Sequence, residues 1–120
     1  MAERKLGTVV ISPGVLCTIA RLTTLSVPGV VGMSRRGMQR FLRPCQGDGV
    51  RVQVADEVVI LDIYIVAATD FNMLQLSREI QAQVTRAIHE IVGMGVQEVN
   101  VHIVDVADAG APQPHHSGTA

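Results

Sequence analysis

Hydrophobic and polar residues alternate along several stretches of the chain, which is the pattern of β-strands with one buried face. Residues 7–11 form a short β-branched segment that favours a strand. Residues 50–54 and 58–66 alternate in the same way, and the segment 55–57 between them is short enough for a hairpin turn. Alternation returns over residues 96–106. The pattern therefore predicts four strands.

Apolar residues recur at helical spacing in two other stretches. Ser12 and Pro13 suit a helix start, because Ser caps free backbone N–H groups and Pro needs none at the first helical position. Pro28 and Gly29 break the helix, so we expect it to stop near Ser26. Its apolar positions are Val15, Leu16, Ile19, Ala20 and Leu22.

The second predicted helix begins at Asn72, which with Gln75 forms a capping-box pattern. Gly93 can close this helix in the left-handed conformation. The apolar stripe of the helix consists of Leu76, Ile80, Val84, Ala87, Ile88 and Ile91.

The predicted order of elements is β-α-β-β-α-β. An α+β two-layer sandwich, with two helices on one face of a four-stranded sheet, would bury every apolar stripe. A ferredoxin-like strand order is one wiring that fits. We expect a flexible basic start over residues 1–5, one domain over 6–106 and a disordered tail over 107–120, because the tail lacks large apolar residues.

Composition narrows the class of protein. Apolar residues make up 48% of the 120 residues and the net charge is −1, which excludes a chain that is disordered throughout and disfavours a general polyanion binder. The longest apolar run, residues 58–68, is about half of the ~20 residues that a membrane-spanning helix needs. No apolar signal region follows the first residues, so we expect a cytoplasmic location.

Cys17 and Cys45 do not make a disulfide framework, and Cys17 is expected to be a buried thiol.

Polar residues gather on the sheet face that the helices leave uncovered. Asp62 and His102 could form an acid–base pair, or begin a metal site. The other interpretation is a solvated face with cross-strand polar pairs, which we favour because no second His or Cys lies at ligand spacing and a flat sheet supplies no pocket. No phosphate-binding or nucleophile motif is present, so we expect no catalytic residue, cofactor or metal. The polar residues of this face are Asp62, Tyr64, Asn100 and His102, with Arg51 and Gln53 nearby.

Apolar residues interleave with these polar positions. Val58, Ile60, Val66 and Val104 project to the same side if the alternation holds. A half-apolar face of this kind is typical of a surface that a second copy or a partner covers. We therefore expect self-association through this face or through an exposed strand edge, with Ile60 in the contact.

The segment 34–44 holds four of the ten basic residues and no acidic residue. One helical turn in it would be amphipathic and basic. It fits a mobile loop with solvated arginines, weak contact with an anionic membrane or an acidic protein partner, or nucleic acid. Nucleic acid is disfavoured because the chain has few aromatic residues for base stacking. The candidate contact residues are Arg35, Arg36, Arg40, Phe41 and Arg43.

An ordered set of segments resembles the bacterial alkaline shock protein family, also called the envelope stress response family. The match extends from about Leu6 to Val106, and the closing segment 99–102, Val-Asn-Val-His, is its most telling part. The matching segments are residues 7–11, 27–33, 49–52, 61–66 and 96–104, with Val15, Ile19, Ala20, Gln81, Val84, Ala87 and Ile88.

The resemblance implies a small, cytoplasmic, non-enzymatic protein of the envelope stress response. Some relatives self-associate and are held near the membrane by a separate membrane-spanning partner. The expected function is thus an interaction or scaffold protein, homo-oligomeric and docked to an envelope-linked partner. The alternatives are a small enzyme that uses Asp62 and His102, and a basic-loop adaptor for nucleic acid.

Overall fold

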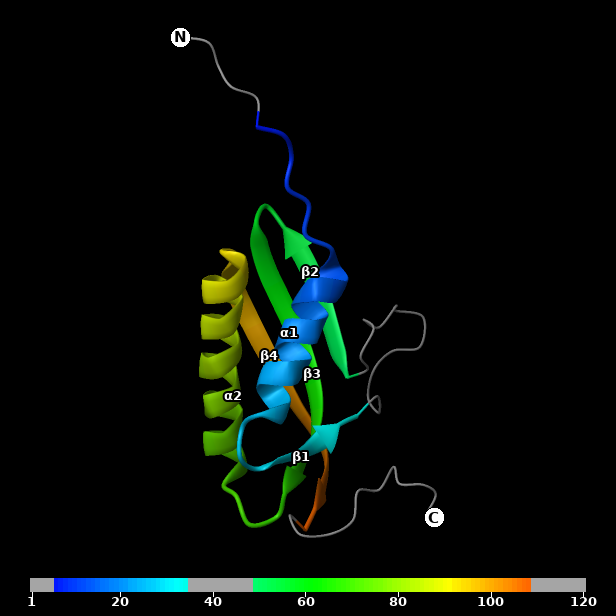
Figure 1. Cartoon of the computed structure of the whole chain (residues 1–120). Coiled ribbons are helices and arrows are strands. Elements are labelled where there is room, and N and C mark those ends of the chain that lie inside the picture. Colours follow the sequence, from blue (N-terminus) through cyan, green and yellow to red (C-terminus); the bar gives the residue numbers. More distant parts are fainter. Residues whose placement is uncertain (1–5, 35–48, 109–120) are drawn as a thin grey trace.

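Two helices lie side by side on one face of a four-stranded sheet in the computed structural model, which describes residues 6–34 and 49–108 (Figure 1). The two-layer α+β fold predicted from the sequence is therefore confirmed. The elements in chain order are α1 (Pro13–Leu25), β1 (Val30–Met33), β2 (Val50–Ala55), β3 (Val58–Ala68), α2 (Met73–Ala87), the π-helical turn η1 (Ile88–Val92) and β4 (Gly95–Ala107).

The sheet is mixed and is organised around β3. Strand β4 runs parallel to β3 along its whole length, so the antiparallel strands β1 and β2 share the other edge of β3. Parallel neighbours need a crossover, which α2 provides. Because β3 and β4 are adjacent, no strand splits this β-α-β unit, and the wiring differs from a ferredoxin-like order.

The first predicted strand, residues 7–11, is wrong. Residues 6–12 have no regular secondary structure, and Val10 is 81% exposed. This segment pairs with no strand of the sheet and runs away from the domain above α1 (Figure 1). The fourth strand is instead β1, just after the Pro28-Gly29 turn. The observed order is thus α-β-β-β-α-β.

Both helices begin where the sequence predicts. Pro13 opens α1, although the Ser12 side chain makes no capping hydrogen bond. At the start of α2, Asn72 Oδ1 accepts a hydrogen bond from the backbone N–H of Gln75 at 2.9 Å. The predicted side-chain cap is therefore confirmed at Asn72 and wrong at Ser12, although both helices begin at the expected residue.

The apolar stripe of α2 changes direction at η1. Leu76, Ile80 and Val84 are buried, but Ile91 is 68% exposed and Val92 packs against the core in its place. The backbone N–H of Gly93 is shared between the carbonyl of His89, at 3.0 Å, and that of Ile88, five residues back, at 3.2 Å. This wider turn shifts the positions that face the sheet, so the prediction that Ile91 belongs to the stripe is wrong.

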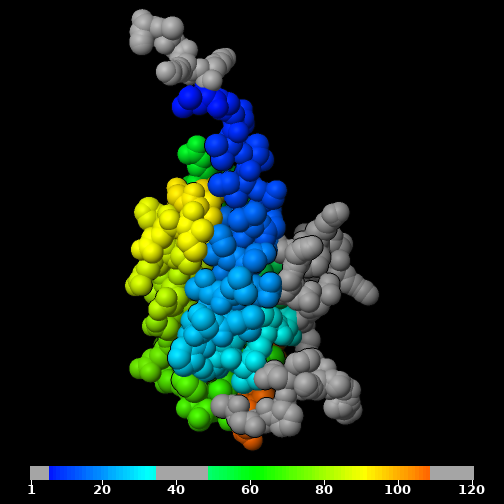
Figure 2. Space-filling view, viewed as in Figure 1, coloured from blue at the N-terminus to red at the C-terminus, as the bar shows by residue number. Residues whose placement is uncertain are grey.

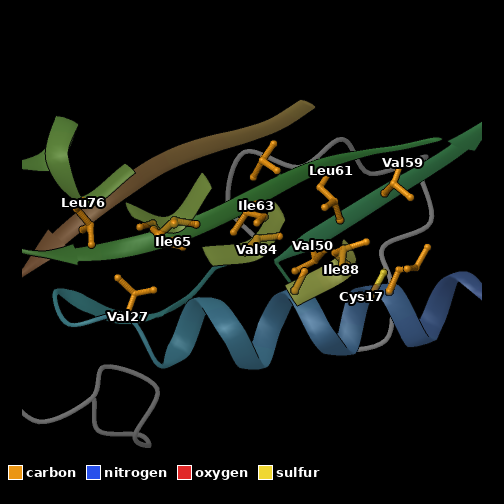
Figure 3. Close-up of a cluster of buried hydrophobic side chains, with 14 of the residues drawn as sticks. Cys17, Val27, Val50, Val59, Leu61, Ile63, Ile65, Leu76, Val84 and Ile88 are labelled. Carbon is orange, nitrogen blue, oxygen red and sulfur yellow. The ribbon is translucent and has the colours of Figure 1, made fainter. Parts of the chain in front are cut away.

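The core lies between the helices and the inner face of the sheet (Figure 3). Cys17 is buried in it, as predicted, but it is disulfide-bonded, so the expectation of a buried thiol is wrong. The largest fully buried side chains are Leu16, Leu61, Ile63, Ile65, Ile80, Ile88, Val50, Val59 and Val84.

Candidate functional site

The face of the sheet opposite the helices, here called the open face, carries the predicted polar residues. Residues of β3 alternate between the core and this face, and the register carries the alternation to both neighbouring strands. Asp62 lies between Arg51 of β2 and Asn100 of β4, and Tyr64 lies beside His102 of β4. The open face comprises Arg51, Gln53, Val58, Ile60, Asp62, Tyr64, Val66, Glu98, Asn100 and His102.

Asp62 is the centre of a polar cluster. Arg51 Nη2 donates to Asp62 Oδ2 at 2.9 Å, and His102 Nε2 lies 3.1 Å from Asp62 Oδ1. Both carboxylate oxygens therefore have a partner, and the residue is only 8% exposed. A carboxylate this buried needs such partners, since an unpaired buried charge is costly. The sequence placed these three residues on one face, and the structure brings them into contact.

The ring of Tyr64 stacks on the ring of His102. The ring centroids are 4.3 Å apart and the planes differ by 7°. The two residues are neighbours in the parallel register, so stacking follows directly from strand pairing. His102 is thus held on one side by Asp62 and on its face by Tyr64. Sequence reasoning missed this contact, because it depends on which strands are adjacent.

The pKa of Asp62 lies below its ordinary value of 3.8. Burial raises the pKa of the carboxyl, but hydrogen bonds from Arg51 and His102, together with their positive charges, outweigh burial and lower it. The folded state therefore favours the ionised carboxylate.

Asp62→Asn is expected to weaken the acid sensitivity of folding. Because the folded pKa is depressed, Asp62 contributes its full stabilisation above the pKa of the unfolded chain, about 3.9, and loses it as the pH falls through the lower folded value. The urea midpoint of the parent should thus fall more steeply than that of the variant between about pH 5 and pH 3. Asp70→Asn, the same change at an exposed position, is the control. Equal slopes for the parent and Asp62→Asn would contradict the prediction.

General acid–base catalysis is the alternative function for the pair Asp62 and His102. An Asp–His pair can orient an imidazole for general-base work. Here the carboxylate is shared with Arg51 and the imidazole lies against Tyr64, so neighbours hold both members of the pair. Within residues 6–34 and 49–108, no three His, Cys, Asp or Glu side chains are grouped so that they could hold a metal ion.

The apolar residues of the open face are partly buried. Val58, Ile60 and Val66 lie between the polar positions of β3 with intermediate exposure. Val104 falls at a β-bulge, so Asp105 rather than Val104 stands opposite Val66. The face is therefore mixed in character, with Ile60 next to the polar cluster.

The other predicted contact residues divide into two groups. The Asn100 amide donates to Glu98 Oε1 at 3.3 Å along the same strand. The arginine-rich segment, with Arg35, Arg36, Arg40, Phe41 and Arg43, lies outside the described residues.

Gln81 of α2 makes a contact with β4 that the sequence did not reveal. Its Nε2 donates to the backbone carbonyl of Val99 at 3.0 Å. A side chain bound to the backbone of an outer strand occupies a group that another strand could use. The position of Gln81 on the helix, one residue after buried Ile80, is the signal that could have suggested this contact.

Comparison with known families identifies the group to which the chain is related. The model of the alkaline shock protein family, which is described by a "cell envelope-related function", matches residues 1–108. The chain belongs to this family. The resemblance seen in the sequence is thereby confirmed. The family description gives an envelope-related function and names no reaction.

Two relatives extend the match to named proteins. YqhY of Bacillus subtilis strain 168 is 29% identical over 110 residues, which cover 87% of this chain and 80% of the relative. Spy1535 of Streptococcus pyogenes serotype M6 is 28% identical over 116 residues, covering 95% of this chain and 90% of the relative. Both are named as uncharacterized proteins.

Solved structures show a similar fold. The copper form of the MamM CTD superposes with a TM-score of 0.57 at 14% identity, over 82% of this chain and 80% of that chain. A manganese form of a MamM CTD variant gives a TM-score of 0.52 at 16% identity, over 85% and 92%. At this identity the likeness concerns the fold alone. In the described part of this alkaline shock family chain, neither α1 nor α2 has the length and apolar character that crossing a membrane requires.

Proposed function

We propose that this member of the alkaline shock protein family is a non-enzymatic interaction protein of the cell envelope, which self-associates and docks to an envelope-linked partner from the cytoplasmic side. The observation that carries the proposal is the character of the open face. A partly exposed Ile60 lies on the same strand as a carboxylate whose two oxygens are held by Arg51 and His102. Preorganised polar groups beside apolar surface suit specific contact with another protein.

The family description supports the same function. It names an envelope-related role, and the described residues of the chain contain no helix that could cross a membrane. A separate partner can supply the link to the membrane. The arginine-rich segment 35–43 remains the predicted contact with anionic lipid or an acidic partner.

Ile60→Lys is expected to weaken self-association, because an unpaired charge resists removal from water at an interface. Sedimentation velocity over a range of protein concentrations measures the change. Ala82→Lys introduces the same charge at an exposed position of α2 and serves as the matched control. A parent that sediments as a monomer at all concentrations would remove self-association from the proposal.

Docking to the partner can be tested with the same pair of variants. Affinity capture from a detergent-solubilised membrane fraction should retain a membrane protein with the parent and with Ala82→Lys, and lose it with Ile60→Lys. Equal capture by all three proteins would mean that the open face is not the docking surface.

A further inference from the structure

Helix α1 presents an apolar stripe to solvent on the side away from the sheet. In α1, the exposed residues Val15, Thr18, Leu22 and Leu25 follow one another at spacings of three, four and three residues, with Thr18 the one polar member. This is the spacing at which one helix packs along another. Leu22, in the last turn of α1, is 55% exposed. The core face of α1 is formed by other residues, namely Leu16, Cys17, Ala20 and Thr24.

Charged side chains are almost absent from α1. Arg21 is the one charged residue among Pro13–Leu25. The solvent-facing side of a helix normally carries polar or charged residues, whereas Val15, Leu22 and Leu25 of α1 are exposed. In Figure 2 the blue surface of α1 lies uncovered in the middle of the helix layer, beside the yellow-green surface of α2. The fold of one copy therefore buries only one side of this helix.

The segment that precedes α1 extends the same apolar surface. Leu6, Val9 and Val10 are each more than 80% exposed, and the β-branched sequence 8–11 favours a strand although no strand of its own copy pairs with it. The segment continues directly from the first turn of α1 (Figure 1). The residue types of this segment favour a strand, but in one copy the segment is exposed and unpaired. A contact with another chain would cover the segment.

We propose that a second copy of this chain covers this surface, with α1 packed against α1 of the other copy and residues 6–11 enclosed in the same contact. The proposal rests on the self-association included in the proposed function and assigns it a surface on the helix layer, separate from the open face. The three-four spacing suits another helix with the same spacing, and α1 itself provides one. Because the stripe carries no charge, nothing in it repels an identical stripe.

The size of the surface agrees with a contact between copies. Seven apolar residues from Leu6 to Leu25, exposed by 38–90%, present on the order of 700 Å², against about 800 Å² per partner in an interface of standard size. A membrane surface is the less suitable occupant. Helices that lie on membranes carry many Lys and Arg on their polar face, whereas α1 carries Arg21 alone.

The test compares Leu22→Lys and Val10→Lys with the parent, with Ala82→Lys as the matched control. Each substitution places a charge where the second copy would exclude water, so the dissociation constant for self-association should rise by about tenfold or more. Sedimentation equilibrium gives the constant. Val10 lies outside every helix and strand, so its substitution cannot unfold an element, and circular dichroism checks that Leu22→Lys keeps its helix content.

Each outcome separates this contact from the one on the open face. Weaker association of Leu22→Lys and Val10→Lys supports the contact through α1, whether or not Ile60→Lys also dissociates. If both variants associate as tightly as Ala82→Lys while Ile60→Lys dissociates, the proposal is overturned and the open face alone carries self-association. A monomeric parent that binds phosphatidylcholine–phosphatidylglycerol vesicles, and loses that binding with Leu22→Lys, would assign the stripe to lipid and overturn the proposal too.

Discussion

Ile80→Ala is expected to lower the free energy of unfolding by about 2–5 kcal/mol, the range measured for removing a large aliphatic side chain from a core. Ile80 lies in the middle of α2 and has no exposed surface. It belongs to the buried hydrophobic cluster that includes Leu61, Ile63 and Val84. The substitution removes buried apolar surface and leaves a cavity that tightly packed neighbours fill only in part.

The matched control is Ile91→Ala in η1. The sequence pattern assigns both isoleucines to one stripe, but Ile91 is 68% exposed. The same chemical change should therefore cost no more than about 0.5 kcal/mol at position 91. Urea unfolding monitored by circular dichroism gives both values. Similar losses at the two positions would contradict the change of direction at η1.

This contrast shows where sequence periodicity is sufficient and where it is not. Helical spacing places Ile80 on the core correctly because α2 is regular from Met73 to Ala87. The turn Ile88–Val92 is π-helical, and the N–H of Gly93 that closes it is shared between the carbonyls of His89 and Ile88. No residue type marks that change in advance. Helical spacing thus predicts the buried residues correctly up to Ile88 and incorrectly at Ile91.

Strand prediction from the sequence likewise succeeds for some segments and fails for others. Alternation identifies β2, β3 and β4, because each has one face against the helices. Residues 7–11 have equally strong strand propensity but no partner strand, while the four residues of β1 are too short to give an alternating signal. Strand propensity describes a segment alone, whereas pairing also depends on where the rest of the fold places that segment.

The sequence predicts which residues form the polar cluster, but it does not predict how they contact one another. Alternation alone puts Asp62, Tyr64 and His102 on the face opposite the helices. Their contacts require β4 to lie parallel beside β3 in the register that pairs Tyr64 with His102, and nothing in the sequence fixes that register. In that register Asp62 bonds diagonally to His102, two residues further along β4 than its direct neighbour Asn100.

Gly49→Ala is the second substitution with a large expected effect, about 2–5 kcal/mol of destabilisation. Gly49 has a φ of +79°, a conformation that side chains disfavour. An added Cβ would lie 3.0 Å from the Ser34 carbonyl oxygen and 3.1 Å from the Tyr64 carbonyl oxygen. Backbone atoms cannot rotate away as side-chain ends can, so the strands themselves would have to move.

Gly93→Ala separates the conformational cost of a positive φ from the crowding of the added Cβ. Gly93 has a φ of +86° but no atom within 4 Å of an added Cβ, so it should lose only the conformational term, about 1–2 kcal/mol. The difference between the two variants then measures the close approach at Gly49. Equal losses in urea unfolding would show that the crowding at Gly49 relaxes without cost.

The same pair of variants also reports on the open face. Gly49 O accepts from the backbone N–H of Tyr64 at 2.8 Å, and Ser34 N–H donates to the Tyr64 carbonyl at 2.9 Å, so the crowded junction fixes the backbone of Tyr64. Tyr64 is the single tyrosine of a chain without tryptophan, so the tyrosine band of the near-ultraviolet circular dichroism spectrum reports on this residue alone. Gly49→Ala should alter that signal in the folded state because the ring stacks on His102, and Gly93→Ala should leave it as in the parent. An unchanged signal in both variants would mean that the position of the Tyr64 ring does not depend on the junction of β1 and β2 with β3.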